Sequence, residues 1–188
     1  MTIPNFISIA RLLLVPAIVY LMITEREWAA GLLFAIAGIS DAVDGFIAKR
    51  FGMTSELGKY LDPIADKALL VSVFVTFGLQ GALPLWLIIL VVSRDILITG
   101  AVMLAWVMGN PIKVQPLVVS KLNTATQIVL IIIVFAVEAG LALLTPVIPA
   151  VVLVVAALTI VSAGAYLVDW MRHMAEAESE QTGHEDAP

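Results

Sequence analysis

Four aspartates lie in the stretch from Ser40 to Lys67, within a chain that otherwise carries few charges. Asp41 and Asp44 are three residues apart, and Asp62 and Asp66 are four residues apart, so each pair would share one face of a helix. Four carboxylates without histidine or cysteine favour hard divalent cations such as Mg²⁺, Mn²⁺ or Ca²⁺. Two such ions would leave the cluster neutral, and the pattern therefore predicts cation binding.

Small residues accompany these aspartates. Gly45 and Ala48 extend the face of Asp41, and Gly58 precedes Asp62 by four residues, which leaves room for phosphates near the backbone. Each small residue taken alone fits close helix packing equally well. For the acids, the alternative is a set of interfacial acids facing water, or of ion pairs with the basic residues of the stretch, which are Lys49, Arg50, Lys59 and Lys67.

Pro63 lies between the last two aspartates and leaves the start of their helix open. A proline inside a helix removes a hydrogen-bond donor and kinks the helix one turn back. The alternative is that Asp62 caps a helix that begins at Pro63, which would weaken the alignment with Gly58.

The elements that must position these residues are membrane helices. Hydrophobic residues make up 61% of the 188 residues and charged residues 13%, well outside the composition of soluble domains. We expect one all-α domain over residues 1–174, an integral membrane bundle of six transmembrane helices, followed by a disordered acidic tail over 175–188. The predicted spans are 5–23, 28–50, 59–80, 83–108, 118–140 and 147–171.

Basic residues gather at alternate connections of this predicted bundle. They are Lys49, Arg50 and Lys59 at the second connection, Lys113 and Lys121 at the fourth, and Arg172 after the last span. The positive-inside rule then places both termini in the cytoplasm. The first span contains Arg11 and no cleavage site follows it, so we interpret it as a retained helix; no transit peptide is evident, which favours a bacterial cytoplasmic (inner) membrane. The sequence has no large cluster of basic residues of the kind that binds nucleic acid.

The aspartate stretch resembles the signature D-x2-D-G-x2-A-R-x8-G-x3-D-x3-D of the CDP-alcohol phosphatidyltransferases. Here the eight positions read Asp41, Asp44, Gly45, Ala48, Lys49, Gly58, Asp62 and Asp66. Lys49 stands where the family has arginine, and Arg50 follows it. Lysine lacks the bidentate fork of arginine, so the phosphate-binding role of position 49 differs from the family pattern.

This resemblance implies a dimeric six-helix membrane enzyme that uses two divalent cations, Mg²⁺ or Mn²⁺. Carried over by motif, all four aspartates would bind metal, and Asp66 would also be the general base. The cytidine diphosphate of CDP-diacylglycerol would be bordered by the other motif positions, which are Asp41, Asp44, Gly45, Ala48, Lys49, Gly58 and Asp62.

Two cations outside the motif indicate the acceptor. Arg94 lies inside the fourth predicted span and Lys121 at the start of the fifth, and buried cations in a bundle usually face a cavity. We expect them to bind the phosphate of an anionic glycerol-based acceptor, with an Arg94–Asp95 ion pair as the alternative. "SRDILI" and "QPLVVSKLNTATQ" look like cardiolipin synthases of the CMP-forming type, whereas Thr99 and Gly100 are similar to phosphatidylglycerophosphate synthases.

Other interpretations stay open at this point. Asn5 and Arg11 could touch nucleotide or headgroup, or be an interfacial cap and an arginine that reaches out to the membrane surface. Intramembrane aspartates also occur in cation or proton transporters. A non-catalytic scaffold that dimerises through small residues is a third class.

Overall fold

The computed structural model describes the backbone of residues 3–51, 56–107 and 118–185, and the side chains of residues 8–41, 64–100, 118–168 and 170–171. The helices are α1 (Ile3–Ile23), α2 (Glu27–Phe51), α3 (Glu56–Gln80), α4 (Leu85–Val107), α5 (Val118–Glu138), a short 3-10 helix η1 (Ala142–Val147) and α6 (Ile148–Glu185). The described residues contain no strand, which confirms the all-α prediction. Each predicted apolar segment corresponds to one of the six α-helices, with ends that differ by a few residues except at the C-terminal end of α6.

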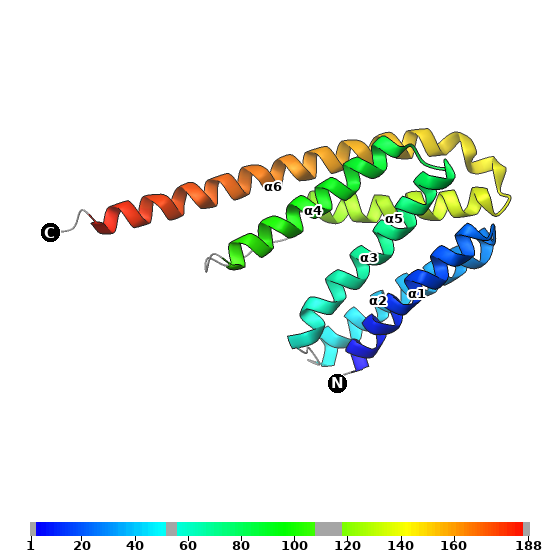
Figure 1. Cartoon of the computed structure of the whole chain (residues 1–188), viewed down its shortest axis with the longest axis horizontal. Coiled ribbons are helices and arrows are strands. Elements are labelled where there is room, and N and C mark those ends of the chain that lie inside the picture. The colour runs from blue at the N-terminus through cyan, green and yellow to red at the C-terminus, as the bar shows by residue number, and fades with distance from the viewer. Residues whose placement is uncertain (1–2, 52–55, 108–117, 186–188) are drawn as a thin grey trace.

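The connections between paired helices are tight turns. Glu25 between α1 and α2 has a φ of 58°, and Gly81 between α3 and α4 has a φ of 79°. Gly140, after α5, has a φ of 108°, a backbone conformation that glycine adopts without a steric cost. In Figure 1 these three turns lie toward one end of the molecule, so consecutive helices run in opposite directions.

Two parts of the helix pattern differ from the sequence prediction. α3 begins at Glu56 and runs through Pro63, so the alternative in which Asp62 caps a helix starting at Pro63 is wrong. α6 continues to Glu185, through most of the segment predicted to be disordered. Alanine, glutamate and glutamine are frequent in "MAEAESEQ", and these residues favour helix even where no apolar face is present.

The helices form two groups (Figure 1). α1 packs against both α2 and α3, while α6 packs against α4 and α5. α2 contacts α5 and α3 contacts α4, and these contacts join the groups. As a result, α1 lies beside both helices that carry the motif aspartates.

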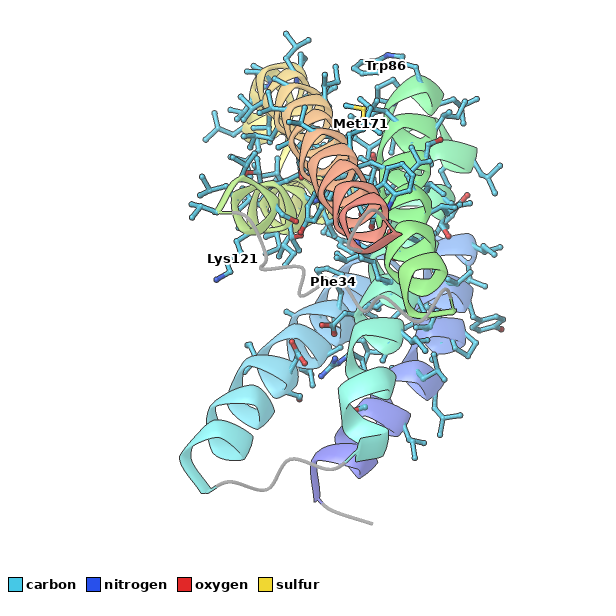
Figure 2. All side chains as sticks on the ribbon, turned by 90° about the vertical axis from the view of Figure 1, so that its left-hand side faces the viewer. Phe34, Trp86, Lys121 and Met171 are labelled. Carbon is cyan, nitrogen blue, oxygen red and sulfur yellow. The ribbon has the colours of Figure 1, made fainter. Side chains whose placement is uncertain are left out.

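An aromatic cluster lies where the two groups meet. The Phe135 ring of α5 is 5.8 Å from the Phe34 ring of α2 and 4.7 Å from the Phe77 ring of α3, measured between centroids. Phe34 lies between the two groups in Figure 2. Gly31 allows this approach, because a Cβ at that position would lie only 3.1 Å from the Cβ of Phe135.

Large apolar side chains also cover the outside of the bundle. Leu13, Tyr20, Leu79 and Leu143 are among the most exposed of the described residues, a distribution that fits contact with lipid. Among the described residues, two stretches are long and apolar enough to cross a membrane by length and composition, Val118–Glu138 and Ala142–Val168. These features indicate a membrane protein.

Candidate active site

Arg11 joins the two motif helices. It extends from α1, with a side chain only 2% exposed, and its guanidinium forms ion pairs with Asp41 of α2 and Asp66 of α3. Both contacts reach the Oδ1 atom of the carboxylate. The two aspartates are 41% and 45% exposed, so both are partly accessible although the arginine between them is buried.

The structure therefore brings the first and last aspartates of the motif to one point. Asp41 is 25 residues before Asp66 in the chain, yet both contact a single side chain of a third helix. The remaining motif positions lie on the same two helices, Gly45 and Ala48 on α2 and Gly58 on α3. The side chains of Asp44, Lys49 and Asp62 lie outside the described residues.

Arg11 is not among the site residues predicted from the motif, although the sequence analysis names it as a residue that could touch nucleotide or headgroup. Of its two interpretations, the arginine that reaches out to the membrane surface is wrong, because the side chain is buried against two carboxylates. The sequence held one signal for this, since a charged residue within an apolar helix usually faces the interior of a bundle.

Arg94 lies in a second buried site on α4. Its side chain is 4% exposed, and its Nη1 donates to Oδ1 of Asp95 at 2.8 Å. Nη2 donates to Ser120 Oγ of α5 and Ser162 Oγ of α6, each at 2.5 Å. The guanidinium also lies 5.8 Å from the centre of the Tyr166 ring, within the range of a cation–π contact.

Asp95 connects this second site to the motif helix. Its Oδ2 accepts an ion pair from Lys67 Nζ of α3 at 2.5 Å, while Oδ1 contacts Arg94. Lys67 directly follows Asp66 in the chain. The two sites are thus adjacent on α3, one dominated by carboxylates and the other by cations.

Lys121 is exposed and does not join the Arg94 site. It is next to Ser120 in the chain, but Figure 2 shows its side chain projecting from α5 away from α4 and α6. The structure brings Arg94 to Asp95, the ion pair that the sequence analysis held as the alternative to phosphate binding.

The carboxylate site has the chemistry of a cation site. Two aspartates from separate helices already share one positive group, and carboxylate oxygens are the ligands that Mg²⁺ and Mn²⁺ prefer. No group of three or more acids or histidines close enough to hold a metal occurs among the described side chains, a set that excludes Asp44 and Asp62. Asp41 and Asp66 fit the two ends of such a site.

Comparison with known proteins agrees with the motif. Residues 1–163 match the family model described as CDP-alcohol phosphatidyltransferase. A Mycobacterium tuberculosis protein named "Putative cardiolipin synthase" is 38% identical over 111 residues, which cover 58% of this chain and 53% of that protein.

Two eukaryotic relatives carry different names. The human "Cardiolipin synthase (CMP-forming)" is 34% identical over 146 residues, covering 69% of this chain and 48% of the human protein. The rice "CDP-diacylglycerol--glycerol-3-phosphate 3-phosphatidyltransferase 1, chloroplastic" is 34% identical over 148 residues, covering 70% of this chain and 45% of the relative. The chain spans about half the length of the curated relatives it matches.

Proposed function

Because the chain belongs to the CDP-alcohol phosphatidyltransferase family, we propose that it transfers the phosphatidyl group of CDP-diacylglycerol to a hydroxyl of phosphatidylglycerol, giving cardiolipin and CMP. The observation that carries this proposal is the convergence of Asp41 and Asp66, from the two motif helices, on one cationic group. It supports a site where positive charge and a diphosphate can be held together.

The donor would lie along α2 and α3. The four motif aspartates hold two divalent cations, Mg²⁺ or Mn²⁺, and Gly45, Ala48, Lys49 and Gly58 border the cytidine diphosphate. When bound, the cations neutralise charge on the diphosphate and make CMP a better leaving group. The backbone of α2 and α3 places all of these positions on two neighbours of α1, which supports a single donor site.

Asp66 is the proposed general base. The acceptor hydroxyl oxygen attacks the phosphatidyl phosphorus, the bond from that phosphorus to the CMP oxygen breaks, and Asp66 accepts the hydroxyl proton. The exposure of Asp66 supports this role, since nearly half of its side-chain surface is accessible to an incoming hydroxyl. Arg11 fixes the same carboxylate from the buried side and so orients it.

The phosphate of the acceptor is proposed to bind near Arg94 and Lys121. Among the described side chains, Arg94 pairs with one carboxylate, which it shares with Lys67, and its hydrogen-bond partners Ser120 and Ser162 are uncharged. Its Nε has no hydrogen-bond partner among the described residues, so one buried donor remains for a phosphate oxygen. Lys121 would have to turn toward this site on binding.

The names of the relatives support phosphatidylglycerol as the acceptor, since proteins named cardiolipin synthase are among the most similar. The second candidate is glycerol 3-phosphate, which the rice relative's name and the Thr99–Gly100 pair favour. Both acceptors carry a phosphate, so the Arg94 site serves either one.

The proposed setting is a bacterial inner membrane. All six α-helices would cross it, with both termini and the aspartate site on the cytoplasmic side, and the enzyme would act as a homodimer. The alternating direction of the helices and the shared end of their tight turns support this topology.

A reconstituted assay tests the reaction. Purified protein receives CDP-diacylglycerol and Mg²⁺ or Mn²⁺, with phosphatidylglycerol and glycerol 3-phosphate offered separately, and CMP release is measured. CMP release with phosphatidylglycerol is expected. CMP release with glycerol 3-phosphate but not with phosphatidylglycerol contradicts the proposed acceptor. If no CMP is released with either acceptor, the proposed phosphatidyl transfer is contradicted. Ion flux in proteoliposomes without CMP release would instead support the transporter alternative.

A further inference from the structure

Arg11 presents an electrostatic problem that phosphatidyl transfer by itself does not explain. Its guanidinium carries a positive charge, and it is buried against two carboxylates that are proposed metal ligands. A cation fixed beside a metal site repels the metal and occupies one oxygen of each carboxylate, the Oδ1 atom. Its presence therefore has a direct consequence for metal binding.

We propose that Arg11 is a built-in counter-ion that holds Asp41 and Asp66 in the metal-free enzyme and gives up these ion pairs when a divalent cation binds. This inference rests on the proposed metal binding by the two aspartates. Arg11 is a positioning residue in this scheme, because it acts through the carboxylates and not on the substrate.

The burial of the three side chains supports an exchange of this kind. Arg11 is 2% exposed and approaches from inside the bundle, whereas Asp41 and Asp66 are nearly half exposed. A cation from solution can therefore reach these partly exposed carboxylates, whereas the arginine is held inside the bundle. The two positive groups compete for the same pair of acids.

The arrangement of helices explains why a counter-ion is needed. Asp41 and Asp66 are on α2 and α3, and two carboxylates brought together without a cation repel each other. α1 packs against both of these helices and delivers the neutralising charge. The metal-free site is thereby kept assembled, at the cost of weaker metal binding, because each ion must displace the arginine.

The first test is Mn²⁺ affinity, measured by electron paramagnetic resonance of free Mn²⁺ over purified protein in detergent. Arg11→Gln removes the charge and should bind Mn²⁺ at least about tenfold more tightly than the wild type. Arg11→Lys keeps the charge and should stay close to the wild type. The matched control is Arg26→Gln, an exposed arginine in the turn before α2, which should leave affinity unchanged.

Thermal unfolding of the same proteins gives a second readout. Without metal, Arg11→Gln should unfold at a lower temperature than the wild type, and added Mn²⁺ should raise its midpoint by a larger amount. A residue with only a structural role would lower the midpoint equally with and without Mn²⁺. That result, or wild-type or weaker Mn²⁺ affinity in Arg11→Gln, overturns the proposal.

A third measurement uses the wild-type protein and does not depend on the folding of Arg11→Gln. With ¹⁵N-labelled arginine, the Nε resonance of Arg11, assigned through Arg11→Lys, should shift when Mg²⁺ is added. The Arg26 resonance should not move. An unchanged Arg11 signal at saturating Mg²⁺ overturns the proposal. Failure of the wild type to bind either cation overturns it by removing its premise, and that outcome also contradicts the proposed metal site.

Discussion

Arg11 and Arg94 are both buried arginines in this bundle, but their surroundings have opposite balances of charge. Arg11 is shared by two carboxylates, Asp41 and Asp66, which leaves the group with one negative charge in excess. Around Arg94, one carboxylate is shared by two cations, since Asp95 also contacts Lys67. The proposed function uses the first region to bind cations and the second to bind the acceptor phosphate.

The partners of the two arginines also differ in kind. Arg11 contacts charged oxygens on half-exposed side chains. Arg94 makes two of its hydrogen bonds to the neutral hydroxyls of Ser120 and Ser162, which fix the guanidinium without cancelling its charge. The difference indicates how one bundle keeps opposite charges available on neighbouring helices: acids are exposed and shared, while the cation is buried and held by hydroxyl groups.

The largest expected effect is on the carboxylate region. Asp66→Asn retains the shape of the side chain but removes the proposed base, so the rate of CMP release should fall by about 10²- to 10⁴-fold. The control is Glu25→Gln, an exposed acid in the turn after α1, which should keep wild-type activity. If Asp66→Asn releases CMP as fast as the wild type, the carboxylate region does not supply the general base.

Asp95→Asn tests the cationic region. It removes the acid between Arg94 and Lys67, and breaking a buried ion pair by losing one partner costs about 3 to 5 kcal/mol. We expect a loss near the lower limit, about 3 kcal/mol, because the Lys67 side chain is 39% exposed. The free energy of unfolding in detergent gives the measurement, with Ser93→Ala, an exposed neighbour on α4, as the control. A loss no larger than that of Ser93→Ala would contradict the ion-pair assignment.

Ser162→Ala addresses the hydroxyl partners alone. It removes one of the acceptors for Arg94 Nη2 while Ser120 remains, so we expect a loss of about 1 to 2 kcal/mol in unfolding free energy. The KM for the acceptor should also rise, with little change in the KM for CDP-diacylglycerol. A change confined to the KM for CDP-diacylglycerol would indicate that Arg94 binds the donor, and it would contradict the assignment of the cationic region to the acceptor.

The smallest effect concerns an acid outside both regions. Glu27, which precedes the apolar stretch of α2, accepts a hydrogen bond from Gln80 Nε2 at 3.1 Å. Burial raises the pKa of Glu27, the Gln80 hydrogen bond opposes this shift, and the nearby Glu138 and Glu25 add to it. The folded protein therefore holds this proton more tightly than the unfolded chain.

Stability should consequently fall as the pH rises through the raised pKa of Glu27, and it should be highest below the ordinary carboxyl value. Glu27→Gln removes this titration. The unfolding midpoints of wild type and Glu27→Gln, compared between about pH 4 and pH 7, should diverge as the pH rises, with the variant the more stable at the upper end. Parallel curves would contradict the raised pKa. Asp41 and Asp66 are paired with an arginine, whereas Glu27 has only a neutral amide partner among the described residues. The pH dependence of stability therefore reports how a partly buried acid behaves with an uncharged partner.

The helices and the motif positions follow directly from the sequence. Apolar runs separated by short polar joints predict the bounds of α1 to α5 and the start of α6 within a few residues, because the length of an apolar run largely sets the length of a membrane helix. The spacing of Asp41, Asp44, Asp62 and Asp66 predicts two helices that each present carboxylates on one face, and α2 and α3 carry them.

The partners of the buried charges do not follow from the sequence. Arg11 contacts residues 30 and 55 positions away, and Arg94 contacts Ser162, 68 positions away. No local period encodes such pairs, because they depend on how whole helices pack. Among these pairs, only Arg94–Asp95 could be predicted from the sequence, because the two residues are neighbours in the chain. The long α6 was also missed, since its last turns lack the apolar repeat that identifies the earlier helices.

The adjacency of Asp66 and Lys67 on α3 has a mechanical consequence. Asp66 is bound through Arg11 to α1, and Lys67 is bound through Asp95 to α4. A helix moves as a stiff rod over such a short interval, so a rotation or slide of α3 displaces both side chains at once. A displacement of α3 therefore changes the carboxylate region and the cationic region together.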